Sequence, residues 1–445
     1  MIRLRDLGIW AGGNTPSKSN TAYWSDGTVP WVSPKDMKVD EISSSVDQVS
    51  KLALVEGRVS LVPDGSVLFV TRSGILSHTF PVAITKLPVT INQDLKALTP
   101  KEGISPKYVA HAIRASSQRI LKECAKHGTT VASIDTNRLL EFQIPIVGIR
   151  RQLEIVAEIE KQFSRLDEAV ANLKRVKANL KRYKASVLKD AVEGRLVPTE
   201  AELARREGRS FETGEQLLQR ILETRRRAWQ GKGRFKEPRP LMAGDLPPLP
   251  AGWTWATMPQ LGELNRGKSK HRPRDDAALY GGRYPFIQTG DVRRSNGAIT
   301  KYSQTYSELG LKQSRLWRVG TLCITIAANI AETGILKIEA CFPDSVVGFA
   351  AEQGYPTTEY VELFIRTARE GLDRFASATA QKNINLEVLT AVAVPIPPLA
   401  EQLRIVAEVD RRLSLSQAGE AQVDANLKRA EALRQSTLQV AFLSS

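Results

Sequence analysis

Apolar and polar positions along the chain form two patterns, and each pattern occurs twice. Short β-branched runs beside glycine, at residues 66–71 and 321–326, predict strands. Residues 108–124 and 360–375 instead place apolar side chains three and four positions apart, which predicts helices. We therefore expect two sheet-rich globular parts that also contain helices.

A longer helical pattern follows each globular part. From Gln152 to Ala191, apolar residues recur every three or four positions and the positions between them are mostly charged, which is typical of a coiled-coil seam. A matching seam begins at Gln402. Two such seams most simply bury each other as an antiparallel pair, because one exposed seam of this length would be an aggregation hazard. The predicted seam core is Val156, Ile159, Phe163, Leu166, Val170, Leu173, Leu180, Val406, Val409, Leu413, Val423 and Leu427.

The chain is an internal duplication. The segment Gln-Leu-Glu-Ile-Val-Ala-Glu-Ile from Gln152 returns as Gln-Leu-Arg-Ile-Val-Ala-Glu-Val from Gln402, and Asp36 matches Asp291 further upstream. Between the copies, a basic amphipathic stretch is followed by closely spaced Pro and Gly, which stop regular structure. We divide the chain into a first domain (1–147), a helical region (148–194), a basic linker (195–252), a second domain (253–397) and a second helical region (398–445).

Charge and cysteine content narrow the class of protein. The 445 residues carry 63 Lys and Arg against 48 Asp and Glu, a net charge of +15, which favours a polyanionic partner such as nucleic acid. Three cysteines and four scattered histidines favour neither a disulfide framework nor a zinc site. No apolar stretch reaches the ~18 to 20 residues that span a bilayer, and the N-terminus lacks the apolar core of a signal peptide. We expect a cytoplasmic protein without membrane contact.

One segment imitates a nucleotide-binding loop. Gly262 to Ser269 fits the pattern G-x4-G-K-S, but the Lys-His-Arg-Pro-Arg that follows cannot start a packed helix. The first copy has Gly8, Gly13 and Asn14 at the matching positions. We interpret the glycines of both copies as turn residues.

Catalytic patterns are missing from the sequence. Pro63-Asp64 with Asp94-Leu95-Lys96 could be read as a PD-(D/E)xK nuclease site, but Asp64 is better explained by a turn before a strand. The second copy has no lysine at the matching place. The chain also lacks the Asn/Asp-Pro-Pro-Tyr tetrapeptide of DNA methyltransferases, a G-x-S-x-G elbow and an H-E-x-x-H pair. We expect it to bind rather than to catalyse.

The order of these motifs, repeated twice, resembles the specificity subunit of a type I restriction-modification enzyme. Each globular part begins with Leu-Gly and a Gly-rich turn, and ends in an Ile-Pro or Val-Pro-Ile-Pro run before Gln-Leu-x-Ile-Val-Ala-Glu. The Ala-Val-Glu-Gly-Arg-Leu-Val-Pro run that ends at Pro198 and the Leu-Pro-Pro-Leu-Pro-Ala-Gly-Trp run that ends at Trp253 also resemble this family. The second run has no counterpart before Met1, so either the first domain lacks an N-terminal strand or the start site is misassigned.

The resemblance implies an α+β chain with two target recognition domains and two long helices that pair as an antiparallel coiled coil with pseudo-twofold symmetry. Each domain would read one half of a bipartite, asymmetric site in double-stranded DNA. The helices would serve as spacer and as docking surface for two methylation subunits, which hold S-adenosylmethionine. Two restriction subunits, motor-nucleases, would join for cleavage with ATP and Mg²⁺. The chain itself would hold no cofactor or metal and would catalyse neither reaction.

Reading bases in the major groove requires polar and basic side chains on exposed loops. We selected such residues in Gly-flanked loops between strands, several of them at equivalent positions in the two copies. In the first domain they are Lys18, Lys35, Lys38, Arg72, Ser73, His78, Lys126, His127, Gly128, Thr129 and Thr130. In the second domain they are Lys268, Lys270, Arg272, Arg274, Gln288, Arg293, Arg294, Asn329, Gln381, Lys382 and Asn383.

Two other classes stay open at this point. A coiled-coil scaffold that binds only protein would leave the positive charge and the unlike sequences of the two domains unexplained. A self-contained methyltransferase or nuclease is disfavoured by the missing motifs. Salt-sensitive binding to duplex DNA would argue against the scaffold, and methyl transfer by the chain alone would identify the enzyme.

Overall fold

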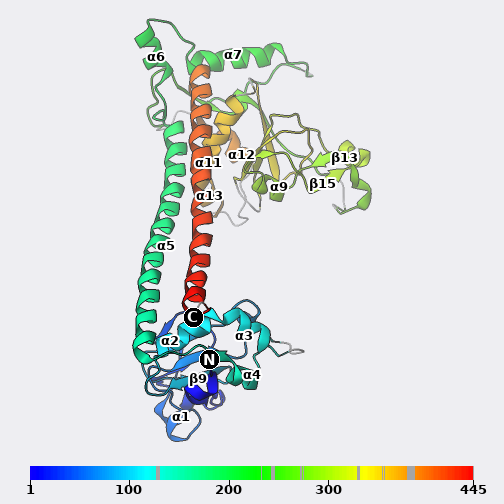
Figure 1. Ribbon diagram of the computed structural model, residues 1–445. Helices are drawn as coiled ribbons and strands as arrows, with labels where there is room; N and C mark the ends of the chain where they lie inside the picture. The colour runs from blue at the N-terminus through cyan, green and yellow to red at the C-terminus, as the bar shows by residue number, and fades with distance from the viewer. Residues whose placement is uncertain are drawn as a thin grey trace. The chain divides into compact units, whose positions relative to one another are not determined.

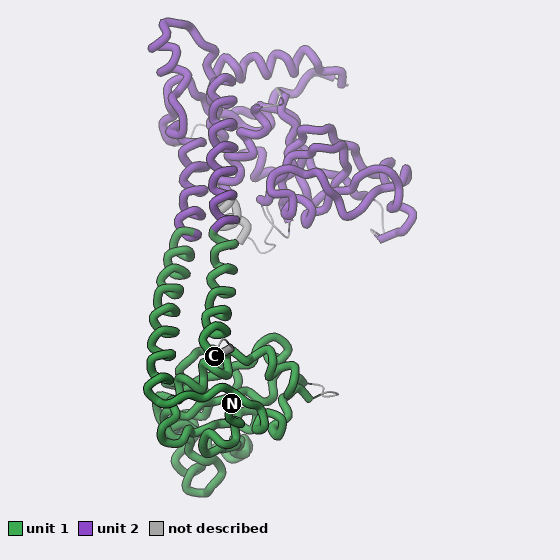
Figure 2. Tube along the Cα trace, in the orientation of Figure 1, with its two compact units in different colours: residues 1–176, 423–445 green, residues 177–422 purple. Residues whose placement is uncertain are grey.

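The structure is a computed structural model that describes residues 1–126, 131–231, 233–241, 246–270, 273, 275–327, 331–352, 354, 356–377 and 386–443 (Figure 1). The chain divides into two compact units (Figure 2). Unit 1 comprises residues 1–176 and 423–445, and unit 2 comprises residues 177–422. Each unit therefore contains one globular domain and a segment of each long helix.

The domain of unit 1 is built mostly from short strands. Its strands are β1 (Ile2–Arg3), β2 (Gly8–Gly12), β3 (Val29–Val32), β4 (Glu41–Ile42), β5 (Asp47–Val49), β6 (Val67–Val70), β7 (Val82–Thr85), β8 (Thr90–Ile91), β9 (Leu95–Pro100) and β10 (Gln143–Ile144). Its helices are α1 (Lys51–Val55), α2 (Pro106–Ala115), α3 (Ser117–Glu123) and α4 (Thr136–Glu141), with 3-10 turns η1 (Leu4–Leu7), η2 (Thr21–Tyr23) and η3 (Gly74–Ser77).

The domain of unit 2 repeats this plan. Its strands are β11 (Thr254–Thr257), β12 (Gly262–Arg266), β13 (Tyr280–Phe286), β14 (Gly297–Ile299), β15 (Gln304–Tyr306), β16 (Leu322–Thr325), β17 (Thr333–Leu336), β18 (Val346–Ala351) and β19 (Ala393–Ile396). Its helices are α8 (Met258–Leu261), α9 (Thr289–Arg294), α10 (Glu308–Lys312), α11 (Thr357–Ser377) and α12 (Leu386–Ala391), with a 3-10 turn η4 (Ala277–Leu279).

Both domains contain the same five-stranded sheet. The strand order is β2-β9-β6-β7-β4 in unit 1 and β12-β18-β16-β17-β14 in unit 2. In each sheet the edge strand β4 or β14 runs parallel to its neighbour and the other pairs are antiparallel. The predicted α+β class and internal duplication are confirmed.

Glycine turns set the start of the central strands β6 and β16. Gly65 and Gly320 have φ angles of +71° and +84°, which favour glycine, and each amide hydrogen-bonds to the end of the neighbouring strand, at Thr85 and Leu336. All four residues of β6 and of β16 are buried, so these runs form the centre of each domain. The predicted turn at residues 63–65 is confirmed.

The first domain contains an N-terminal strand, but a short one. The two residues of β1 pair with β10, whereas the four residues of β11 pair with β19. The alternative that the first domain lacks an N-terminal strand is therefore wrong: the strand is present in both domains, with two residue pairs in the first in place of four in the second.

Two helices pass through both units. Helix α5 (Ile149–Val192) and helix α13 (Leu399–Leu443) have 44 and 45 residues. In unit 1, the start of α5 shares a core with the end of α13, and in unit 2, the end of α5 shares a core with the start of α13. The predicted antiparallel pairing is therefore confirmed within each unit (Figure 1).

The predicted seam residues differ in burial. Val156, Ile159, Phe163, Val406 and Val409 are buried because they also pack into a domain core. Most of the other predicted seam residues are only half-buried. This second group comprises Leu166, Val170, Leu173, Leu180, Leu413 and Leu427, whereas Val423 is buried.

The segment predicted as a basic linker contains two helices that belong to unit 2. Helix α6 (Glu200–Glu207) starts with a capping box formed by Thr199 and Glu202, and α7 (Gly214–Arg227) with another. Leu217 and Ile221 of α7 are fully buried in the core of the second domain. Residues 199–227 therefore extend that domain.

The three cysteines lie in the interior of the protein. Cys124, Cys323 and Cys341 are free and buried, and desolvation raises the pKa of all three thiols, that of Cys124 to about 11.

None of the helices among the described residues combines the length and apolar character needed to cross a bilayer.

Candidate nucleic-acid interface

A close backbone approach fixes the same turn in both domains. A Cβ atom on Gly13 would lie 1.9 Å from the Asn92 carbonyl oxygen, and one on Gly267 would lie 2.2 Å from the carbonyl oxygen of Phe342. A side chain would clash at either position, so glycine is required.

The residue after each of these glycines continues the turn. The Asn14 amide donates to the Ile91 carbonyl at 3.0 Å, and the Lys268 amide donates to the Phe342 carbonyl at 3.2 Å. The segment that resembled a nucleotide-binding loop is strand β12 followed by this turn. Among the residues described after it, the next helical element is the three-residue turn η4. The interpretation of Gly267 as a turn residue is confirmed.

An aspartate shapes a second turn in each domain. The Asp36 carboxylate accepts the Ser33 amide at 2.8 Å, and the Asp291 carboxylate accepts the Gln288 amide at 3.0 Å. Asp291 also accepts the Ser303 hydroxyl at 3.0 Å. These contacts hold Lys35 and Lys38 in unit 1, and Gln288, Arg293 and Arg294 in unit 2, on short, braced segments.

The candidate residues of the first domain that the structure describes lie on loops, and two of them have acidic partners. Lys35 pairs with Asp47 at 2.7 Å and Arg72 pairs with Asp94 at 2.6 Å. Exposed pairs of this kind contribute little net energy, so a phosphate could replace the carboxylate. Lys18, Lys38, His78 and Lys126 are exposed, and Ser73 caps η3.

In the second domain, strand β15 brings two candidate groups together. The Gln288 side chain donates to Gln304 at 2.5 Å, and the Tyr306 hydroxyl lies 3.5 Å from the Ser269 hydroxyl. The turn with Lys268 and Lys270 and the start of α9 therefore flank one strand. Arg294 pairs with Asp291 at 2.7 Å, and Arg293 is exposed beside it.

The other candidates cannot be placed. Residues His127, Gly128, Thr129, Thr130, Arg272, Arg274, Asn329, Gln381, Lys382 and Asn383 lie outside the described residues. Whether any candidate touches DNA stays a prediction.

Sequence reasoning missed a cation beside the same strand. Arg283 of β13 is 77% exposed, lies over the Tyr284 ring at 5.0 Å and pairs with Glu308 at 2.9 Å. Hydrogen bonding to the Tyr284 hydroxyl raises the pKa of Arg283. The sequence signal was Gly281-Gly282 ahead of an alternating Arg-Tyr pair, which is typical of an exposed strand at a bend.

The described residues offer no metal centre: no three His, Cys, Asp or Glu side chains among them converge as ligands would. Asp94, part of the nuclease-like pattern, instead holds Arg72 and accepts a hydrogen bond from Asn92 at 3.1 Å. The arrangement can present donors and cations to a polyanion, which is the chemistry of a binding surface.

The family model of the type I restriction modification DNA specificity domain matches residues 1–182 and 250–423. The specificity subunit of the type I restriction enzyme EcoR124I/EcoR124II of Escherichia coli is 41% identical over 167 residues, which is 38% of this chain and 41% of that protein. The type I restriction enzyme MjaIX specificity subunit of Methanocaldococcus jannaschii is 28% identical over 176 residues, 39% of either chain. The chain thus aligns with about two fifths of the length of these curated relatives.

Two solved structures share the fold over nearly the whole chain. A chain from a structural study of complex assembly and conformational transition in the type I R-M system has a TM-score of 0.66 at 19% identity, covering 99% of this chain and 96% of that one. The HsdS subunit from Thermoanaerobacter tengcongensis has a TM-score of 0.53 at 19% identity, covering 99% and 95%.

Proposed function

The chain belongs to the family of type I restriction modification DNA specificity domains, and we propose that it reads a bipartite, asymmetric target in double-stranded DNA. Each domain contacts one half-site. The chain gives sequence choice to a complex whose chemistry is performed by other subunits.

The main support for this proposal is that the two domains share the same backbone framework but carry different side chains at its turns. The turn after the first strand presents Asn14 in one domain and Lys268 in the other. In the second turn, the amide that the aspartate accepts belongs to Ser33 in one domain and to Gln288 in the other. A protein identifies a base by its pattern of hydrogen-bond donors and acceptors. Two domains with the same framework but different loop side chains would therefore read two different half-sites.

The partners follow from the family. Two methylation subunits carry S-adenosylmethionine, and two restriction subunits use ATP and Mg²⁺ for translocation and cleavage. This chain holds no cofactor and catalyses neither reaction, and it works in the cytoplasm. The long helices α5 and α13 provide the surface on which the methylation subunits dock.

A domain exchange tests the proposal. Residues 1–144 are replaced by the first domain of another family member, and methylated bases are mapped across the genome of cells that carry the whole complex. The donor must keep an aromatic or apolar residue against Phe442, which contacts Tyr108 at 5.0 Å between ring centres. We expect one half-site to change and the other to stay. A change in both half-sites, or in neither, would contradict modular reading.

A further inference from the structure

The end of α7 and the segment that follows it, residues 225–239, form a strip of nearly uniform charge. Seven of these fifteen residues are Lys or Arg, and only Glu237 is acidic. This basic strip therefore has a net charge of +6, out of +15 for the whole chain. It lies between the regions 1–182 and 250–423 that match the family model, so the family match does not explain its charge.

The basic strip is attached firmly to the second domain. Leu217 and Ile221 of α7 are fully buried in the core of unit 2. At the end of the helix, the Arg225 guanidinium donates hydrogen bonds to the carbonyl oxygens of Pro259 and Gln260, the second at 3.3 Å. The strip therefore starts from a fixed point on that domain.

Most cations of the strip are available to a partner. Three of them are exposed and have no acidic partner in the described part of the chain, namely Arg234, Lys236 and Arg239. Arg226 pairs with Glu237 at 2.7 Å. Arg227, whose side chain is 82% exposed, pairs with Glu223 at 3.3 Å. Exposed pairs of this kind contribute little net energy, so a phosphate can replace either carboxylate.

The composition of the strip fits DNA better than a protein surface. Protein interfaces have an apolar centre with aromatic anchors and are depleted in Lys. The two aromatic side chains of the strip, Trp229 and Phe235, contact each other at 5.8 Å between ring centres. The Trp229 indole also donates to the Gly233 carbonyl at 3.1 Å, so these rings shape a turn. One ring that is half-exposed gives no apolar patch, whereas phosphate contacts need only the cations.

The strip starts at a distance from the candidate base-reading residues of the second domain. Its fixed point at Pro259 and Gln260 precedes β12, whereas Lys268 follows the end of that strand. Five residues of strand span about 16 Å, which is close to five base pairs at about 3.4 Å each. Figure 1 also shows α7 and α9 at opposite ends of this domain. The strip therefore fits DNA that lies beyond the bases at those loops.

We propose that the basic strip binds the phosphate backbone of duplex DNA outside the target, on the side of the half-site that the second domain reads. The inference rests on the proposed function, which supplies the DNA. The strip adds affinity that does not depend on base sequence, because every phosphate carries the same charge. It anchors the complex beside the target and takes no part in reading it.

The test uses the full-length chain in complex with the methylation subunits of the same restriction system. Fluorescence anisotropy measures DNA binding at several salt concentrations. Methylation mapping gives the target, and the domain exchange identifies the half-site of the second domain. One duplex ends at the target, and two others extend it by about ten base pairs, one helical turn, on one side or on the other.

Two double variants remove the same amount of charge. In the strip variant, Arg234→Ala is combined with Lys236→Ala. In the matched control, Arg205→Ala is combined with Arg206→Ala. The control residues are exposed in the last turn of α6, in the same unit, and form no ion pair among the described residues. A third variant, Arg234→Lys with Lys236→Arg, keeps the charge of the strip.

We expect the wild-type complex to bind the duplex that is extended beside the second domain about tenfold more tightly than the other two. The strip variant should lose most of this gain. Its slope of log affinity against log salt on that duplex should fall by about two, because each phosphate contact contributes about one. The control and the variant that keeps the charge should stay within about threefold of the wild type. The methylated sequence should not change in any variant.

Each other outcome counts against the inference. If the strip variant weakens binding equally on all three duplexes, or if the control weakens it as much, the strip does not bind DNA beside the second half-site. If the strip variant binds every duplex like the wild type, the inference is overturned. Loss of a restriction subunit from that variant's complex in native mass spectrometry would then identify an acidic protein surface as the occupant. If the wild-type complex binds none of the duplexes, the proposed function itself fails.

Discussion

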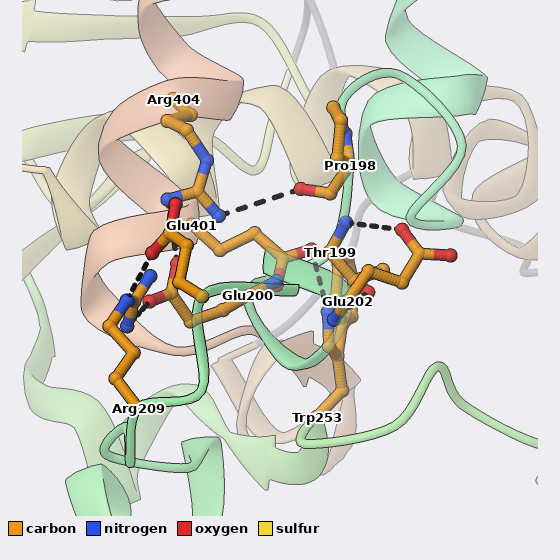
Figure 3. Close-up of polar contacts among 9 residues, drawn as sticks. Pro198, Thr199, Glu200, Glu202, Arg209, Trp253, Glu401 and Arg404 are labelled. Carbon is orange, nitrogen blue, oxygen red and sulfur yellow. Dashed lines mark hydrogen bonds and ion pairs between the residues drawn. The ribbon is translucent and has the colours of Figure 1, made fainter. Parts of the chain in front are cut away.

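The Trp253 indole donates a hydrogen bond of 2.9 Å to the fully buried Glu401 carboxylate, although the two residues are 148 positions apart (Figure 3). This bond joins the start of the second domain to the first turn of α13. It also fixes a carboxylate whose burial raises its pKa.

Glu401→Ala should lower the free energy of unfolding of unit 2 by about 2 to 4 kcal/mol, because two buried donors lose their acceptor and Arg404 loses a nearby anion. Arg151→Ala, at the equivalent position of the first copy, removes only an exposed pair and should cost less than about 0.5 kcal/mol. Denaturant unfolding of both variants gives the comparison. Equal effects would contradict a stabilising role for the buried contacts of Glu401 with Trp253 and Glu200.

His111→Leu should flatten the acid dependence of stability in unit 1. Desolvation, aided by Arg114 and Lys107, lowers the pKa of His111 to about 3, and its Nδ1 has no hydrogen-bond partner within the described part of the chain. Below the unfolded value of about 6.5, the unfolded imidazole takes up a proton that the folded one does not. Stability therefore falls as the pH decreases, by about 2 kcal/mol at pH 5.

Leucine suits this position because the duplication places Leu363 there in the second domain, where it is buried. Urea unfolding of the variant and the wild type at pH 7.5 and pH 5 measures the difference. If both proteins lose the same stability on acidification, His111 is not the group responsible.

Lys268→Ala should weaken DNA binding without changing ATP binding by the complex. The turn is held by the Lys268 amide and by the close approach at Gly267, neither of which involves the lysine side chain. Loss of one phosphate contact should lower the slope of log affinity against log salt by about one. Lys189→Ala, an exposed change on α5, is the control. Loss of ATP binding would contradict the turn interpretation.

Local and repeated patterns made much of the fold predictable from the sequence. The buried strands β6 and β16 follow from β-branched runs beside glycine, and the long helices follow from their seam. The capping-box residues at Thr199 and Thr213 indicate α6 and α7. The closely spaced Pro and Gly that follow them instead favoured the prediction of a linker.

Contacts between distant segments were not predictable in this way. Glu200 and Glu401 are 201 residues apart, and no periodic pattern joins them. The contacts of Gln288 and Ser269 with β15 depend on how the hairpin of β13 and β15 packs. Sequence reasoning could therefore select exposed polar loops, but it could not show which of them lie together.

The helix pair should set the spacing between the two half-sites. The offset between the copies is 250 residues at Gln152 and Gln402, 254 at Ala171 and Ala425, and 250 again at Ser186 and Ser436. Four-residue shifts therefore occur within the seam, and a coiled coil tolerates them because the apolar stripe stays nearly in phase.

Four residues lengthen a helix by about 6 Å, close to two base pairs at about 3.4 Å each. The helices are linked by Asp167–Arg434 at 2.6 Å in unit 1 and by Lys184–Glu420 at 2.6 Å in unit 2. An insertion in α5 alone would break one of these pairs, so the design repeats Val-Lys-Ala-Asn after Asn179 and Ala-Asn-Leu-Lys after Lys428. Mapping of methylated bases should show unchanged half-sites with one or two more base pairs between them. An intact complex that keeps the old spacing would refute a spacing role for the helices.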